Sequence, residues 1–244
     1  MPQIRIYPDT EHLAHAAAEH LVTVAVSSID DRGSFSVALS GGSTPRRAYE
    51  HLATIELASQ VDWSHIHVFW GDERCVAAHH PDSNYGMARE ALLDHIPIPT
   101  RNVHRVLGEL APAEAASRYE ETLRQFFSPE QEGEAVTFDL VLLGMGTDGH
   151  TASLFPRSEL LAEKSHWVAP YQVDQSKAWR ITLTPPAINA ARQVTFLVSG
   201  RAKARTVQQV IRGPRQPRLL PTQIVRPKSG NLTWLLDSAA ASLL

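Results

Sequence analysis

The sequence predicts an α/β protein with one doubly wound, mostly parallel sheet and helices on both faces. Short apolar runs rich in β-branched and aromatic residues alternate along the chain with longer stretches of helical periodicity. Several of these runs are apolar throughout, which indicates strands buried on both faces. Strands separated by helices favour parallel pairing through right-handed crossovers.

The individual elements follow from these patterns. The expected strands, most of which stop at Gly or Pro, cover residues 35–39, 66–70, 138–143, 180–184 and 194–198. The expected helices cover residues 10–29, 45–58, 83–95, 112–127 and 201–211. Residues 128–136 and 213–221 carry Pro, Gly and charges typical of surface loops. Neither loop looks like a domain boundary, so we expect residues 1–244 to form a single domain.

Composition limits the class of protein. Hydrophobic residues make up 43% of the 244 positions and charged residues 20%, which suits a globular core. Cys75 is the single cysteine, so no intrachain disulfide forms and a reducing compartment is indicated. The N-terminus lacks the pattern of a signal peptide, and no apolar run reaches about 18 residues. We therefore expect a cytoplasmic protein that does not bind membranes.

Charge is distributed unevenly along the chain. Between Asp174 and Asp237 there is no acidic residue, whereas Lys and Arg recur throughout that stretch. Such a stretch favours an anionic ligand. Its aromatic residues, chiefly Trp179, Phe196 and Trp234, lie in strand-like segments and are predicted to be core, which argues against nucleic-acid binding.

Four expected strands are followed by polar turns. The turns cover residues 40–45, 71–74, 144–150 and 199–203. In an open α/β sheet the carboxyl ends of the strands line the ligand crevice, so these turns should converge in space.

The first turn leads into an expected helix. We expect Ser43 or Thr44 to cap this helix and Pro45 to occupy its first position. The free N–H groups and positive dipole end of a helix N-terminus bind phosphate, and Lys203 and Arg180 would supply balancing charge. A capped helix without a ligand is the alternative.

The third turn contains a G-x-G-x-x-G pattern but does not suit a dinucleotide. Asp148 lies inside the loop, where it would repel a pyrophosphate. The turn is better explained as a support for His150, because an imidazole with a pKa of about 6.5 is the usual general base and a carboxylate two residues away can orient it. A histidine placed in a loop by chance is the alternative.

The second turn carries both acidic and basic side chains. Asp72 and Glu73 provide carboxylates for sugar hydroxyls or proton transfer, and Arg74 provides a guanidinium fork for a carboxylate-like group. A charged surface turn is the competing interpretation. The nearby His79, His80 and Asp82 lack a second ligand group at metal-site spacing, so we expect no metal and no other cofactor.

Together these motifs resemble those of 6-phosphogluconolactonases. The matching segments are 40–45 (SGGSTP), 70–74 (WGDER), 81–85 (PDSNY) and 138–156, which includes GMGTDGHTASLFP, and the resemblance runs from about residue 5 to residue 236. It implies a modified Rossmann-like fold shared with glucosamine-6-phosphate deaminase. It also implies hydrolysis of 6-phospho-D-glucono-1,5-lactone to 6-phospho-D-gluconate, the second step of the oxidative pentose phosphate pathway.

The related isomerases set the main alternative. They typically carry a glutamate five residues after the loop histidine and a tyrosine after the Asp-Glu pair, whereas this chain has Phe155 and Arg74. Proton shuttling between carbons needs the extra carboxylate, while ester hydrolysis needs an activated water and a stabilised oxyanion. A sugar-phosphate binding protein is a further alternative, but no room precedes the first strand for a helix-turn-helix segment.

The resemblance leads to a mechanism for a small-molecule sugar-phosphate lactone. His150 would deprotonate water, Asp148 would orient His150, and Arg74 or loop N–H groups would hold the oxyanion. The expected substrate-binding residues are Gly42, Ser43, Thr44, Asp72, Arg180 and Lys203. We expect a monomer or weak homodimer.

Overall fold

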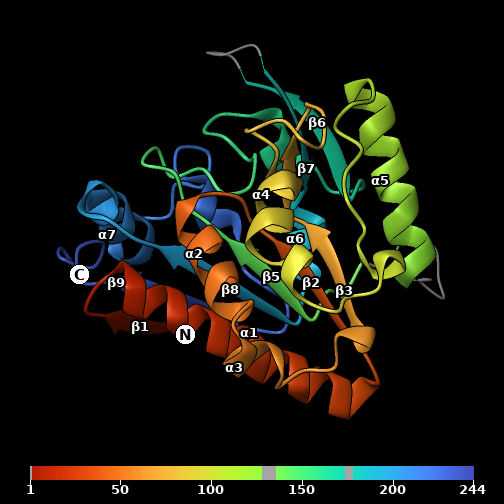
Figure 1. Ribbon diagram of the computed structural model, residues 1–244. Helices are drawn as coiled ribbons and strands as arrows, with labels where there is room; N and C mark the ends of the chain where they lie inside the picture. Colours follow the sequence, from red (N-terminus) through yellow and green to blue (C-terminus); the bar gives the residue numbers. More distant parts are fainter. Residues whose placement is uncertain (1, 128–135, 174–177) are drawn as a thin grey trace.

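The computed structural model describes residues 2–127, 136–173 and 178–244, and its main feature is a six-stranded sheet with the order β1-β9-β8-β5-β2-β3 (Figure 1). All neighbouring strands of this sheet pair in parallel. The strands are β1 (Gln3–Tyr7), β2 (Phe35–Leu39), β3 (Ile66–Trp70), β5 (Leu140–Leu143), β8 (Gln193–Val198) and β9 (Leu232–Asp237). The predicted α/β class with a mostly parallel sheet is confirmed. Most of the predicted loop 128–136 lies outside the described residues.

A second, antiparallel sheet of three strands has the order β4-β7-β6. Its strands are β4 (Asp72–Arg74), β6 (Val168–Gln172) and β7 (Trp179–Leu183), and β6 lies beside α5 in Figure 1. The sequence pattern predicted a strand at 180–184 but not a separate sheet, and it predicted a turn at 71–74. The short charged segment is a strand because β7 pairs with it.

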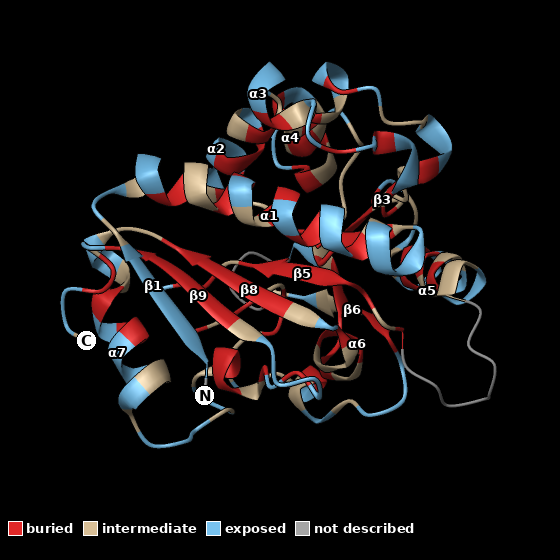
Figure 2. Ribbon diagram, turned by 90° about the horizontal axis from the view of Figure 1, so that it is seen from below, coloured by how far each residue is buried: buried red, intermediate tan, exposed pale blue. Residues whose placement is uncertain are grey.

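Helices cover both faces of the parallel sheet, with α1 along one face and α6 and α7 on the other (Figure 2). The helices are α1 (Thr10–Arg32), α2 (Ser43–Leu52), α3 (Ile55–Ala58), α4 (Asn84–Ala91), α5 (Pro112–Phe127), α6 (Pro185–Ala190) and α7 (Ala204–Arg212). Short 3-10 turns are η1 (Trp63–His65), η2 (Leu93–His95), η3 (Thr100–Asn102), η4 (Glu159–Ala162), η5 (Arg201–Lys203) and η6 (Pro221–Ile224). The predicted helix at 45–58 is therefore divided into α2 and α3, and that at 83–95 into α4 and η2. No helix in the described ranges has the length and apolarity needed to span a membrane.

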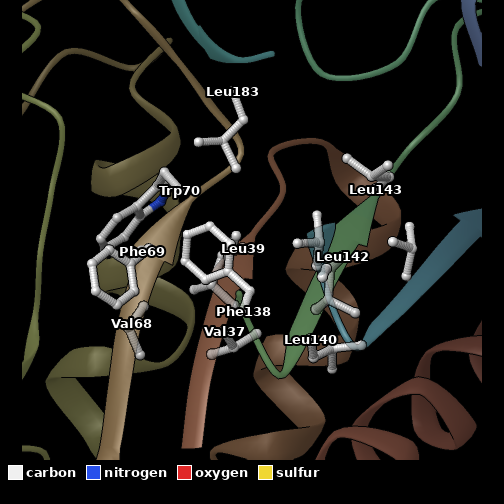
Figure 3. Packing of buried hydrophobic residues seen from close by; sticks show 14 of the residues in the cluster. Val37, Leu39, Val68, Phe69, Trp70, Phe138, Leu140, Leu142, Leu143 and Leu183 are labelled. Carbon is white, nitrogen blue, oxygen red and sulfur yellow. The ribbon is translucent and has the colours of Figure 1, made fainter. Parts of the chain in front are cut away.

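The main core lies around the central strands of the parallel sheet. Figure 3 shows Val37, Leu39 and Leu142 among side chains packed between β2, β3 and β5, and all three are buried. Each fully buried side chain of this size contributes roughly 1.5–3 kcal/mol. This burial explains why the central strands are apolar throughout.

Two of the three aromatic residues that the sequence assigned to the core are there. Phe196 and Trp234 are buried and stack with ring centroids 4.2 Å apart. The prediction for Trp179 is wrong, because its side chain is 40% exposed. Trp179 begins a strand of the small antiparallel sheet, where local apolar character does not decide which face is covered.

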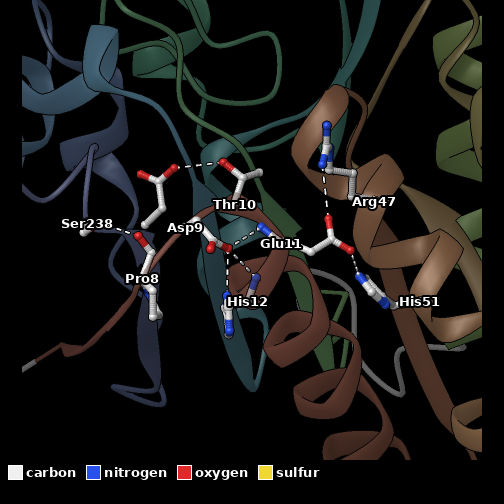
Figure 4. Close-up of polar contacts among 9 residues, drawn as sticks. Pro8, Asp9, Thr10, Glu11, His12, Arg47, His51 and Ser238 are labelled. Atoms are coloured by element: carbon white, nitrogen blue, oxygen red, sulfur yellow. Dashed lines mark hydrogen bonds and ion pairs between the residues drawn. The ribbon is translucent and has the colours of Figure 1, made fainter.

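Polar contacts fix the start of α1 against α2 and β9. The Asp9 carboxylate caps α1 by accepting the N–H groups of Glu11 and His12 at 3.0 and 2.9 Å (Figure 4). Glu11 reaches α2, where it accepts from Arg47 at 3.1 Å and pairs with His51 at 2.7 Å. These contacts hold α2, whose N-terminus borders the site described next.

Candidate active site

A cavity of about 290 Å³ lies at the carboxyl ends of the parallel strands. All four polar turns predicted to converge contribute to its wall. The lining residues are Ser40, Gly41, Gly42, Ser43, Thr44, Pro45, Asp72, Arg74, Asn84, Gly144, Met145, Gly146, His150, Ala152, Leu197, Val198, Ser199 and Lys203. The sheet topology therefore brings together segments that are about 160 residues apart in the sequence, as the strand-end rule predicts.

The N-terminus of α2 borders the cavity without a side-chain cap. Helix α2 begins at Ser43, and Gly42 occupies the cap position with a φ of 105°. The predicted cap at Ser43 or Thr44, with Pro45 first in the helix, is therefore wrong. The reason is that Gly42 reaches a conformation that starts the helix two positions earlier. Since no side chain of the helix caps it, the first N–H groups are left for a ligand.

Thr44 makes a different polar contact from the predicted one. Its Oγ1 lies 2.7 Å from Oγ of Ser199, which follows β8. This hydrogen bond joins the first and fourth turns across the cavity wall. Ser199 belongs to the predicted turn 199–203, but the sequence did not indicate a function for it.

His150 and Asp148 form a close pair. His150 Nδ1 lies 2.6 Å from Asp148 Oδ1, and the same oxygen accepts the His150 N–H at 3.1 Å. Burial raises the pKa of Asp148, but the charge and hydrogen bonds of His150 outweigh this effect and lower it overall. Asp148 contacts His150, which lines the cavity, but does not line the cavity itself.

Gly146 allows this pair to form. A Cβ at position 146 would lie 2.1 Å from His150 Nδ1 and 2.4 Å from Asp148 Oδ1. The Gly146 N–H also donates to the His150 carbonyl at 2.8 Å, which closes the loop. The glycine pattern in this loop thus makes room for the histidine–aspartate pair instead of for a pyrophosphate.

The His150 ring is supported on one face by aromatic side chains. Phe155 stacks on it with centroids 4.5 Å apart and planes 28° apart. Tyr171 of β6 stacks in turn on Phe155 at 5.5 Å. Phe155 is one of the two positions that distinguish lactonases from the related isomerases, and its ring contacts the imidazole of His150, the expected base.

Lys203 closes the cavity from the side of η5. Its Nζ donates to the carbonyl of Met145, in the same loop as His150. Burial lowers the pKa of the Lys203 ammonium, and the nearby Asp148 carboxylate opposes that shift. A half-buried ammonium beside the open end of α2 suits an anionic group.

The three charged residues of β4 point in alternate directions. Asp72 and Arg74 line the cavity, and the Arg74 guanidinium donates to the carbonyl of Asp82. Arg180, unlike the other residues predicted to bind substrate, is not part of the cavity wall. It pairs opposite Arg74 on β7, where burial, followed by the charge of Arg74, lowers its pKa.

Glu73 points away from the cavity and is buried, with 1% of its surface exposed. It accepts the N–H groups of Asn84 and Tyr85 at 2.7 Å each, and the Ser83 hydroxyl at 3.2 Å. Burial raises the pKa of Glu73, while the N–H donors of Tyr85, Asn84 and Arg74 oppose this change. Glu73 therefore fixes the start of α4 instead of meeting a substrate.

Sequence reasoning missed two polar neighbours of Asp72. Asn84 Nδ2 donates to the Asp72 carbonyl at 2.8 Å, and Ser153 Oγ donates to Asp72 Oδ2 at 2.8 Å. Both lie within motifs that the resemblance rests on, at 81–85 and 138–156. Within the described ranges, no group of three or more His, Cys, Asp or Glu side chains is arranged to hold a metal ion.

Comparison with known proteins places this site in a family. The model of the family "Glucosamine-6-phosphate isomerases/6-phosphogluconolactonase" matches residues 8–234. The chain belongs to this family. Within it, the chain is of the 6-phosphogluconolactonase type: it is 42% identical to the 6-phosphogluconolactonase of Nostoc over 99% of this chain and 98% of the relative. It is 41% identical to the 6-phosphogluconolactonase of Synechocystis over 100% of this chain and 98% of that relative.

Solved structures agree in fold with this lactonase-type chain. A 6-phosphogluconolactonase from Trypanosoma cruzi superposes with a TM-score of 0.88 at 31% identity, covering 100% of this chain and 97% of the other. A monomeric glucosamine-6-phosphate deaminase superposes with a TM-score of 0.81, covering 99% of this chain and 100% of the other. At 20% identity this likeness shows the shared fold alone. The predicted likeness to the deaminase fold is confirmed.

Proposed function

We propose that the chain hydrolyses 6-phospho-D-glucono-1,5-lactone to 6-phospho-D-gluconate, with His150 activating the attacking water. The observation that carries this proposal is the His150–Asp148 pair, which borders the same cavity as the uncapped N-terminus of α2. A base and an anion site within one small cavity suit a phosphorylated substrate with a hydrolysable carbonyl.

The phosphate would bind at the start of α2. Gly42, Ser43 and Thr44 present the N–H groups of that helix end, and Lys203 adds a positive charge across the cavity. Arg180 would act only through its charge, from its position opposite Arg74 on the neighbouring strand, because it is not part of the cavity wall. Fixing the phosphate places the lactone relative to His150, which lowers the entropic part of the barrier.

His150 would act through Nε2, because Nδ1 is engaged by Asp148. Nε2 takes a proton from water while the water oxygen bonds to the lactone carbonyl carbon. The tetrahedral intermediate then breaks its bond to the ring oxygen, which receives the proton from His150. Arg74 or the loop N–H groups stabilise the oxyanion that forms between these steps.

A deaminase or isomerase activity is the second candidate. The stacking of Phe155 on His150 argues against it, because an apolar ring occupies the position where the related isomerases typically carry a carboxylate. A sugar-phosphate binding protein without activity is the remaining alternative, and it leaves the close His150–Asp148 pair unexplained. For location we propose the cytoplasm.

The decisive experiment is a lactonase assay on freshly generated lactone, corrected for spontaneous hydrolysis, beside an assay for ammonia release from glucosamine 6-phosphate. We expect His150→Ala to lose most turnover and Lys203→Ala chiefly to raise KM. His95→Ala, in η2 outside the cavity, is the matched control and should behave as wild type. Ammonia release would instead assign the chain to the isomerases, and silence in both assays would favour a binding protein.

A further inference from the structure

Asp72, on the short strand β4, is held by two neighbouring side chains while it lines the cavity. Its Oδ2 accepts the Ser153 hydroxyl at 2.8 Å, and its Oδ1 lies 3.3 Å from Asn84 Nδ2. The same amide nitrogen donates to the Asp72 carbonyl at 2.8 Å. Both oxygens of the carboxylate are thus engaged by neutral donors, while the residue still lines the cavity.

The two donors are themselves buried and fixed. Ser153 is 1% exposed and its N–H donates to Thr182 Oγ1 at 3.2 Å, which ties it to β7. Asn84 is 3% exposed and its N–H is held by Glu73 at 2.7 Å. The Asn84 side chain also lies against Gly41, where a Cβ would come within 1.9 Å of Oδ1. Neither donor can leave Asp72 without disturbing a neighbouring element.

This arrangement has a chemical consequence. A carboxylate has about four lone-pair sites, so one donor on each oxygen leaves acceptor capacity on Asp72. The two donors fix the orientation of the carboxylate, so its remaining acceptor sites have a fixed direction. The groups of a sugar lactone that can donate to such an acceptor are its ring hydroxyls.

We propose that Asp72 selects lactones carrying a particular ring hydroxyl, and that Ser153 and Asn84 are positioning residues that orient the Asp72 carboxylate toward that hydroxyl. This inference rests on the proposed lactonase function but assigns a separate task. His150 carries the proton transfer, and the Asp72 group determines which sugar lactone is accepted. A site built to accept a hydroxyl rejects the analogue that lacks it, because the remaining acceptor site of the half-buried Asp72 carboxylate then has no donor.

The test compares the parent lactone with phosphorylated lactones lacking the hydroxyl at C2, C3 or C4, by kcat/KM. With the wild type, one deoxy lactone should be about tenfold or more poorer than the parent, the value expected for a hydrogen bond to a charged group. Ser153→Ala should lower kcat/KM for the parent toward that of this deoxy lactone and leave the deoxy lactone nearly unchanged. Asn84→Ala, which removes the other donor, should shift the same ratio.

Controls separate selection from general damage. Ser153→Cys keeps a weak donor and should retain part of the selectivity. Ser28→Ala, a buried serine of α1 outside the cavity, should leave every ratio unchanged. An equal loss for all lactones, or no change in selectivity with either Ser153→Ala or Asn84→Ala, would overturn the inference. A wild type without lactonase activity would instead remove the proposed function, so the two failures are distinguishable.

Discussion

His150 depends on its immediate neighbours for its position. Asp148 binds one edge of the ring, Phe155 covers one face, and Gly146 leaves the space in which the pair meets. These contacts leave Nε2 as the nitrogen available to a substrate. They also make the function sensitive to substitutions that remove no charged or polar group.

Replacement of Phe155 tests the support of the ring. Phe155→Leu removes a stacked aromatic contact, which is worth about 0.5–1.5 kcal/mol, so kcat should fall by roughly two- to tenfold. KM should change little, because Phe155 does not line the cavity. Phe155→Tyr keeps the ring and should restore kcat. Steady-state kinetics of the three proteins would contradict this account if the tyrosine variant lost as much as the leucine variant.

Replacement of Gly146 tests the close approach. In Gly146→Ala the new Cβ would meet His150 and Asp148 at 2.1 and 2.4 Å, so the pair must move apart. We expect kcat/KM to fall about a hundredfold, as for a catalytic group misplaced by about an ångström. Gly33→Ala is the control, since it has nothing within 4 Å but a φ of 78°. It should cost about 1 kcal/mol of stability and leave kcat/KM unaltered.

Among the elements, β4 and α4 form a single unit through Glu73. The strand directs Asp72 and Arg74 into the cavity and Glu73 into the interior, as strand alternation requires. Glu73 then takes the N–H groups at the start of α4, which places Asn84 beside Asp72. A charged triplet that resembles a surface turn in sequence is thus a connector between two elements of the site.

Substitution of Glu73 by glutamine tests this connection. Gln keeps the shape but sets an NH2 group against N–H donors, so the free energy of unfolding should fall by about 2–3 kcal/mol. The drop can be measured by urea denaturation. Glu56→Gln, an exposed residue of α3, provides the control and should change stability by less than about 0.5 kcal/mol. A similar small change for Glu73→Gln would show that these hydrogen bonds do not hold α4 in place.

At the scale of the whole molecule, two half-buried histidines contribute to the response of stability to acid. Burial, followed by the charge of Arg5, lowers the pKa of His20 to about 4, and burial with His67 lowers that of His104 to about 4. His20 pairs with Thr195 Oγ1 at 3.1 Å beneath α1. Both imidazoles must be neutral in the folded chain at neutral pH.

The sign of the effect follows from linkage. Above about pH 6.5 His20 is neutral in both the folded and the unfolded chain. As the pH falls toward 4, the unfolded chain binds a proton at His20 before the folded chain does. The free energy of unfolding therefore decreases. For His20 the loss should approach about 3 kcal/mol. Urea denaturation from about pH 7 to about pH 4.5 should show the decline, and His20→Gln should flatten it. Equal pH dependence in the two proteins would show that His20 does not contribute.

Much of the architecture was predictable because it rests on local patterns. Apolar runs, most of which stop at Gly or Pro, predicted five strand positions, and helical periodicity located most helices within a few residues. The convergence of four turns followed from one general property of parallel sheets. The separate antiparallel sheet and the exposure of Trp179 were not predictable, because a short strand does not specify its partner or its covered face.

The sequence by itself determined the fold class, the family resemblance and the pairing of His150 with Asp148, which are only two residues apart and so are brought together by local loop geometry. Only the tertiary structure decided that Arg180 lies opposite Arg74 on the paired strand and that Ser153 holds Asp72, because these contacts join residues 106 and 81 positions apart. Such contacts depend on how sheets and helices pack against each other. Hydrogen bonds between distant segments form only where that packing brings donor and acceptor within reach.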